Sequence, residues 1–250
     1  IYKEQKGSAQ IKSLCLITAL NTPKDSISKI TSLKSRDHTE RLFKYLKIPI
    51  KIKKKGNYDF IEVKGGYQHS GFVQKIPGDI SSASFFICLT LLSKNSKITI
   101  KNVNVNKTRT GIIDLANKIC PGSIKIKNKK TSSGEEIADI FVKSAKKFKA
   151  ISPSPSFISR TIDEFPLIFL MCAKAKGIST IKKIGEMRLK ESDRIKVCAN
   201  FLRQINIKII EKRDSLKIYG NPNLNLNKKI TVKNFMKDHR IFMLSCIAAF

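Results

Sequence analysis

One pattern recurs along this 250-residue chain and limits what it can fold into. A polar turn leads into an apolar stretch with helical spacing, and one or two short β-rich segments follow it. The helical stretches are expected to start near residues 8, 35, 78, 108, 161, 190 and 238. Repeats of roughly 55 to 85 residues, each with a pair of helices and strands between them, predict an α/β architecture built from copies of one unit.

The first predicted helix, over residues 8–20, carries apolar residues at helical spacing. Helical spacing places five residues on its inner side, namely Ile11, Leu14, Cys15, Ile17 and Thr18. We expect this side of the helix to be buried.

A polar segment at residues 65–74 separates two of the helix starts. It predicts a domain boundary near Lys75, Ile76 and Pro77, so that one domain ends at residue 76 and a second occupies residues 77–250. The chain begins at Ile1 and stops inside an apolar run predicted to be helical. We therefore expect a fragment of a longer protein, incomplete at both ends.

The formal charge of +30 is compatible with two classes of binding partner. A strongly basic chain can bind nucleic acid, and it can equally bind small anionic substrates. The lysines are spread through every segment, and no RNA-binding aromatic signature, zinc-finger spacing or basic arm accompanies them. We therefore expect no nucleic-acid partner, and a basic nucleic-acid-binding module is kept as the alternative from a different functional class.

The positions of the cysteines and the hydropathy of the sequence indicate the cellular compartment of the protein. The six cysteines lie far apart, mostly in apolar runs, and none has the spacing of metal ligands. No segment is long enough to span a bilayer, and no charged-then-apolar leader is present. The sequence predicts a soluble, cytoplasmic protein with reduced core cysteines, no membrane partner and no metal.

Several helix starts carry charged or hydroxyl groups in front of a buried stretch. They are residues 79–82, 163–164, 190–194 and 238–240, with two weaker ones at 7–10 and 35–38. Helix capping explains the Ser and Asp residues. It does not explain Arg194 and Arg240, because a cation at a helix start opposes the helix dipole, whereas each guanidinium could grip a phosphate or carboxylate. For Asp163 two readings stay open, an N-cap and a partly desolvated general base.

Taken together, seven motifs in order resemble the enolpyruvyl transferase family, and within it the members that act on shikimate 3-phosphate. The motifs occupy residues 7–13, 35–40, 78–83, 108–111, 162–166, 188–194 and 238–240. The resemblance implies a two-domain α/β fold, an inside-out barrel in which each domain is assembled from three copies of a βαβαββ-type unit. It also implies a monomer without a cofactor, with its substrates bound between the domains.

The resemblance assigns substrate contacts by position. The residues expected to bind shikimate 3-phosphate are Ser8, Ala9, Gln10, Ser35, Arg36, Asp163, Glu186 and Lys190. Those expected to bind phosphoenolpyruvate are Gln10, Arg194 and Arg240. Ser35 is similar to the family's phosphate-binding serine, and Glu186 stands where some relatives have Asn.

The resemblance also implies a reaction, in which an enolpyruvyl group moves from phosphoenolpyruvate to the 5-hydroxyl of shikimate 3-phosphate. The hydroxyl adds to C2 while C3 is protonated, and the tetrahedral intermediate then loses phosphate. Asp163 resembles the residue that takes the hydroxyl proton. Glu191 is the candidate for proton transfer at the methylene carbon, and Lys190 would contact the reacting centre.

Three departures from the family pattern limit this interpretation. An N-terminal Lys/Ser/Arg phosphate-binding motif and an Arg-bearing loop are absent, as is a Lys expected after residue 250, so we expect the 250-residue chain alone to be inactive. The nearest alternative enzyme is the UDP-N-acetylglucosamine enolpyruvyl transferase, which shares fold and chemistry. The forms of residues 35–38 and 190–194 favour the shikimate 3-phosphate enzyme.

Overall fold

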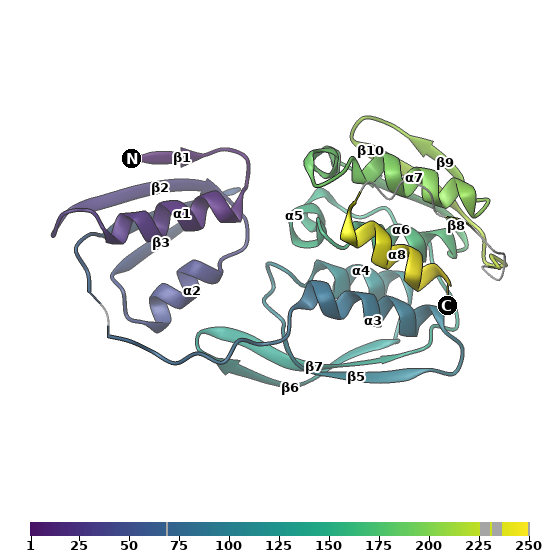
Figure 1. Cartoon of the computed structure of the whole chain (residues 1–250), viewed down its shortest axis with the longest axis horizontal. Helices are drawn as coiled ribbons and strands as arrows, with labels where there is room; N and C mark the ends of the chain where they lie inside the picture. The colour runs from purple at the N-terminus through teal and green to yellow at the C-terminus, as the bar shows by residue number, and fades with distance from the viewer. Residues whose placement is uncertain (69, 226–230, 232–236, 250) are drawn as a thin grey trace. The chain divides into compact units, whose positions relative to one another are not determined.

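The computed structural model describes residues 1–68, 70–225, 231 and 237–249 (Figure 1). Contacts divide the chain into two units. Unit 1 comprises Ile1–Pro77 together with Lys130–Ile137, and unit 2 comprises Gly78–Lys129 together with Ala138 to the end of the chain.

Unit 1 is one complete βαβαββ repeat. Its elements are β1 (Tyr2–Glu4), α1 (Ala9–Leu20), β2 (Ile27–Leu33), α2 (His38–Tyr45), β3 (Ile50–Lys55) and β4 (Tyr58–Lys64). The sheet order is β1-β2-β4-β3, with β1 parallel to β2 and the other two pairs antiparallel. Helix α1 packs on β2 and β4, and α2 packs on β3, around a small core that includes Leu16, Phe43 and Ile61.

The predicted inner side of α1 is mostly wrong, although Cys15 packs against the core and is half-buried. Leu14 and Ile17 are 65% and 52% exposed, whereas the buried residues are Lys12, Leu16 and Ala19. These three lie at spacings of four and three residues and form one stripe along the helix. Apolar residues occur on nearly every side of α1, so periodicity alone could not select the buried stripe, and the side that packs is the one where Lys12 meets Glu40.

A second copy of the repeat follows, and it belongs to unit 2 except for residues 130–137, which are part of unit 1. Its elements are α3 (Ile80–Leu92), β5 (Lys97–Asn104), α4 (Gly111–Ile119), β6 (Ile124–Ser132) and β7 (Glu135–Lys143). The sheet order is β5-β7-β6. A single parallel bridge between Gly78 and Val103 takes the place that β1 holds beside β2 in unit 1.

A third copy follows and is built in the same way. Its elements are η1 (Pro155–Phe157), α5 (Ile158–Thr161), α6 (Phe165–Ala173), β8 (Gly177–Lys182), η2 (Gly185–Leu189), α7 (Arg194–Gln204), β9 (Lys208–Glu211) and β10 (Ser215–Gly220). The sheet order is β8-β10-β9, and a parallel bridge joins Lys149 to Lys176. Helix α8 (His239–Ala249) comes after it. The predicted α/β class and its repeated unit are therefore confirmed.

The core of unit 2 is arranged around α6, in which every residue from Phe165 to Ala173 is buried. Helices α3, α4, α7 and α8 all contact α6. The core includes four of the six free cysteines, and burial raises the pKa of Cys120 and Cys172 to about 12, which keeps them as thiols. Cys246, by contrast, is exposed.

Two features are absent from the described residues. None of their helices combines the length and apolar character needed to cross a membrane. Nor do they contain a cluster of three or more His, Cys, Asp or Glu residues that could hold a metal ion.

Candidate active site

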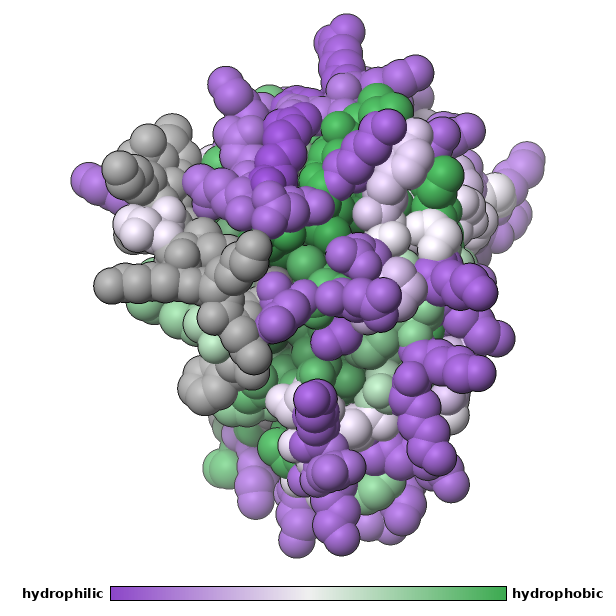
Figure 2. Space-filling model, turned by 90° about the vertical axis from the view of Figure 1, so that its right-hand side faces the viewer, coloured by the Kyte–Doolittle hydropathy of each residue, from purple (hydrophilic) through white to green (hydrophobic). Residues whose placement is uncertain are grey.

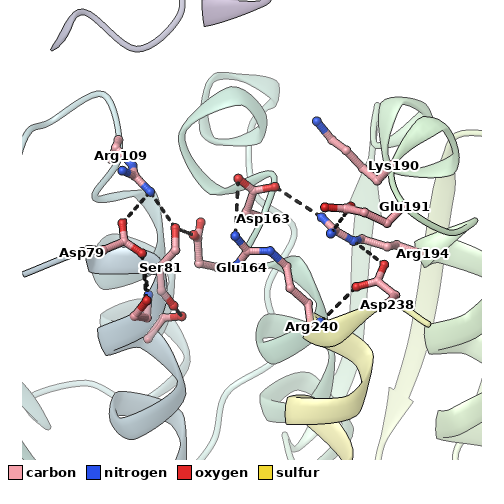
Figure 3. A network of polar contacts seen from close by, with 12 residues as sticks. Asp79, Ser81, Arg109, Asp163, Glu164, Lys190, Glu191, Arg194, Asp238 and Arg240 are labelled. Carbon is pink, nitrogen blue, oxygen red and sulfur yellow. Dashed lines mark hydrogen bonds and ion pairs between the residues drawn. The ribbon is translucent and has the colours of Figure 1, made fainter. Parts of the chain in front are cut away.

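Charged side chains at the starts of α6, α7 and α8 meet in unit 2 (Figure 3). The starts lie close together because α6 contacts both α7 and α8 along the core. The first backbone N–H groups of each helix have no partner within the helix and carry a partial positive charge. The region is therefore suited to hold anions, and in this structure the anions are carboxylates of the chain itself.

Arg194 lies at the centre of this cluster, with a side chain that is 1% exposed. Its Nε donates to Asp238 Oδ2 at 2.9 Å, one terminal nitrogen donates to Asp163 Oδ1 at 3.3 Å, and the other donates to Glu191. Burial alone lowers the pKa of Arg194, but the hydrogen bond that it donates to Asp238 and the three carboxylate charges more than reverse this and raise it. Arg194 can therefore be the first residue of α7, because the carboxylates offset both the cost of burying its charge and the repulsion from the positive end of the helix dipole.

Asp238 joins the starts of α7 and α8. The residue is fully buried, and its Oδ2 accepts from Arg194 and, at 2.9 Å, from Ser192 Oγ. Its Oδ1 accepts from the backbone N–H of Arg240 at 3.0 Å, so it also satisfies the first turn of α8. Burial alone raises the pKa of Asp238, but the hydrogen bonds from Arg194 and Ser192 outweigh it and hold the pKa below its usual range.

Asp163 lies between two guanidinium groups. It contacts Arg194, and its Oδ2 lies 3.9 Å from a terminal nitrogen of Arg240. Its side chain is 16% exposed. The N-cap of α6 is Glu164, so the capping interpretation of Asp163 is wrong, and its surroundings are charged rather than purely apolar.

Lys190 and Glu191 are the more accessible members of the cluster. Lys190 Nζ lies 2.9 Å from Glu186 Oε1, and the side chains of the two residues are 27% and 54% exposed. Glu191 is 53% exposed while its carboxylate contacts Arg194. Asp193 caps α7 by accepting from the N–H of Lys196, as predicted. Ser192 is not a cap, because its hydroxyl donates to Asp238.

A second polar network lies at the starts of α3 and α6 (Figure 3). Arg109 donates to Ser81 Oγ at 2.7 Å and pairs with Asp79 Oδ1 at 2.8 Å, and Ser81 donates to Glu164 Oε1 at 2.5 Å. Asp79 is the N-cap of α3, as expected, and accepts from the N–H of Ser82. Ser81 instead links α3 to α6, a role that sequence reasoning missed because its partner lies 83 residues away.

In unit 1 the predicted residues lie at the start of α1 and just before α2. Ser8 caps α1 by accepting from the N–H of Ile11, and its hydroxyl lies 3.5 Å from Gln10 Oε1. Ala9 is the first residue of α1, and Gln10 is exposed. Ser35 Oγ is buried and has no hydrogen-bond partner among the described residues, which leaves it available to a ligand. Arg36 follows it and is partly exposed.

One buried and one half-buried contact hold the starts of α1 and α2 together in unit 1. Lys12 Nζ lies 2.6 Å from Glu40 Oε1, and the two side chains are 0% and 5% exposed. The hydroxyls of Ser13 and Thr39 are 2.7 Å apart. Sequence reasoning did not identify Lys12 as a buried residue, although its position within the motif at residues 7–13 was noted.

Comparisons with known proteins agree with this arrangement of motifs. The family model for EPSP synthase (3-phosphoshikimate 1-carboxyvinyltransferase) matches residues 2–250. The 3-phosphoshikimate 1-carboxyvinyltransferase of Petrotoga mobilis is 40% identical over 249 residues, covering 99% of this chain and 55% of the relative. That of Geotalea daltonii is 37% identical over 248 residues, with 99% and 55% coverage.

Solved structures give the same result. EPSP synthase from Acinetobacter baumannii matches with a TM-score of 0.84 at 30% identity, covering 100% of this chain and 56% of that one. The enolpyruvyl transferase NikO from Streptomyces tendae matches with a TM-score of 0.64 at 13% identity, covering 94% and 50%, which shows a shared fold. The chain spans about half the length of the curated relatives it matches, and it belongs to the EPSP synthase family.

Proposed function

We propose that this chain forms part of an enzyme that transfers the enolpyruvyl group of phosphoenolpyruvate to the 5-hydroxyl of shikimate 3-phosphate and releases phosphate. The observation that carries the proposal is the group formed by Arg194, Arg240 and Lys190 around Asp163 and Glu191 at the helix starts of unit 2. Three cations suit two anionic substrates, and two carboxylates suit a reaction with two proton transfers.

Asp163 and Glu191 divide the proton transfers in this proposal. Asp163 accepts the proton of the 5-hydroxyl as that oxygen adds to C2 of phosphoenolpyruvate. Glu191 delivers a proton to C3 and takes it back as the C–O bond to phosphate breaks. Lys190 binds shikimate 3-phosphate near the reacting carbon, and the mechanism requires neither a metal nor an organic cofactor.

Arg194 needs a change of partners to bind phosphoenolpyruvate. Its Nε is held by the fully buried Asp238, whereas its terminal nitrogen contacts Glu191, which is half exposed. We expect the incoming anion to replace Glu191 and leave the Asp238 contact intact. The exchange keeps the guanidinium oriented and frees the Glu191 carboxyl for proton transfer.

In unit 1 the proposal assigns Ser8, Gln10, Ser35 and Arg36 to shikimate 3-phosphate. Gln10 also contacts phosphoenolpyruvate, and Ala9 contacts shikimate 3-phosphate. The buried hydroxyl of Ser35, which has no partner among the described residues, supports a phosphate ligand at this point. Glu186 is assigned to the same substrate through its contact with Lys190.

The proposal also includes the predicted domain boundary, oligomeric state, cellular location and partners. Residues 1–76 form the end of the first domain and residues 77–250 most of the second. The enzyme is a cytoplasmic monomer that binds neither nucleic acid nor membranes.

The test measures phosphate release by the full-length enzyme with shikimate 3-phosphate and phosphoenolpyruvate. We expect Asp163→Asn to lower kcat by about 10²–10⁴-fold, because it removes a general base. We expect Lys190→Ala mainly to raise the KM for shikimate 3-phosphate. Arg203→Ala is the control, since Arg203 lies on α7 with Arg194 but pairs with Glu211 at an exposed position.

Two results would overturn the proposal. One is turnover by Asp163→Asn at the rate of the Arg203→Ala control. The other is phosphate release with UDP-N-acetylglucosamine but not with shikimate 3-phosphate, which would indicate the alternative transferase.

A further inference from the structure

A cavity of about 920 Å³ lies in unit 2 at the C-terminal ends of α3 and α6. The candidate active site is at the opposite ends of the same helices, near Asp79 and Asp163. Helix α3 has 13 residues, and at about 1.5 Å per residue its two ends lie about 20 Å apart. The cavity is therefore separate from the site described above.

Lysines dominate the lining of this cavity. Eight of its 16 lining residues are lysines, whereas lysine and arginine together make up only 49 of the 250 residues of the chain. None of the described lining residues is acidic. The turn from α3 to β5 provides Lys94 and Lys97, and the turn after α6 provides Lys174 and Lys176. The segment from the end of β7 provides Lys143, Lys146, Lys147 and Lys149. The basic residues, which looked evenly spread in sequence, are concentrated here.

Helix ends do not account for so much charge. The C-terminus of a helix carries about half a negative charge, so α3 and α6 together would be balanced by about one lysine. In the part of the chain that the structure describes, no ion pair involves any of the eight lysines. Their mutual repulsion falls when an anion enters the cavity.

The other lining residues indicate the size and kind of anion. The volume is that of a small-molecule site, about 300–1,000 Å³. Its one aromatic lining residue among those described, Phe148, is 9% exposed and offers no surface on which a base could stack, unlike single-strand nucleic-acid sites. Lysine ammonium groups act as mobile point charges and suit phosphate groups that need no planar, two-pronged contact. Figure 2 looks onto this side of unit 2, where hydrophilic side chains project around apolar surface.

We propose that the lysine-lined cavity at the C-terminal ends of α3 and α6 binds a small anion with a chain of adjacent phosphates. Inorganic tripolyphosphate and nucleoside triphosphates share this chemistry. Binding is independent of the active site, and the phosphate chain rather than a base or sugar provides the contacts.

The test is calorimetric titration of the full-length protein with inorganic tripolyphosphate and, separately, with a nucleoside triphosphate, both with shikimate 3-phosphate held at saturation. We expect one molecule of tripolyphosphate to bind per chain. The triple variant K146Q/K147Q/K149Q should bind it about tenfold more weakly, and the affinity of the unchanged protein should fall steeply with salt. The control K101Q/K125Q/K182Q removes three exposed lysines of unit 2 that do not line the cavity.

Equal affinity for the two ligands supports recognition of the phosphate chain. Much tighter binding of the nucleoside triphosphate would show that its base or sugar also makes contacts, and would overturn recognition by the phosphate chain alone. No binding of tripolyphosphate while shikimate 3-phosphate is at saturation, or an equal loss of affinity in the control, would overturn the proposal. So would tighter binding of single-stranded RNA than of tripolyphosphate, because that would make the region a nucleic-acid surface.

Discussion

At the scale of single residues, the stability of unit 2 depends on how Arg194 is neutralised. The guanidinium is almost completely buried, and among its partners in the described residues Asp238 is the one that is fully buried as well. Removing one member of a buried ion pair leaves the other charged and unpaired, which costs about 3–5 kcal/mol. The accessible partner Glu191 is expected to matter less for folding and more for chemistry.

We therefore expect Asp238→Asn to lower the free energy of unfolding by about 3–5 kcal/mol at pH 7. The carboxyl has a depressed pKa in the folded protein. Its contribution is therefore fully present above about pH 4, the ordinary pKa of Asp, and is lost as pH falls through the lower folded-state value. The variant should lack this part of the acid dependence. Urea unfolding between pH 7 and pH 3 measures both effects.

Asp25→Asn provides the matched control. Asp25 pairs with Lys64, and these side chains are 64% and 53% exposed, so the pair is worth about 1 kcal/mol or less. An Asp238→Asn protein as stable as this control would contradict the assignment of Asp238 as the main partner of Arg194.

At the scale of elements, close approach of backbones decides how helices in unit 2 pack. Gly111 is the first residue of α4, which contacts α5. A Cβ atom at this position would lie 2.0 Å from Thr161 Oγ1 and 2.9 Å from the carbonyl oxygen of Arg160. Thr161 is fully buried and cannot move away into solvent.

We expect Gly111→Ala to force α4 away from α5 and to lower the free energy of unfolding by about 1–3 kcal/mol. Gly71→Ala is the control, because nothing lies within 4 Å of its added Cβ, and it should change stability by about 0.5 kcal/mol or less. Thermal unfolding of the two variants gives the comparison. Equal melting temperatures would show that α4 and α5 do not pack as closely as described.

At the scale of the whole molecule, the chain covers about 55% of the length of its relatives from Petrotoga mobilis and Geotalea daltonii. The proposed site needs further anion-binding groups that the family resemblance places outside these 250 residues. We expect the 250-residue chain by itself to release no phosphate from phosphoenolpyruvate, with or without shikimate 3-phosphate. A phosphate assay beside the full-length enzyme tests this, and turnover by the short chain would show that its own residues suffice.

The sequence by itself determined the repeated unit and most helix starts of this protein. Ser8, Asp79 and Asp193 cap α1, α3 and α7 as predicted. Such signals are local, because a cap bonds to an N–H group three residues away, and apolar spacing marks a helix wherever the helix later packs.

Tertiary structure alone decided which side of each element is buried and which charges meet. It buried Lys12 against Glu40, joined Ser81 to Glu164, and paired Arg194 with Asp238, which lies 44 residues further along the chain. It also gathered lysines that look evenly spread in sequence around one cavity. Spacing within a helix carries no information about such partners, because a buried charge is stabilised only when packing brings its counterion to it.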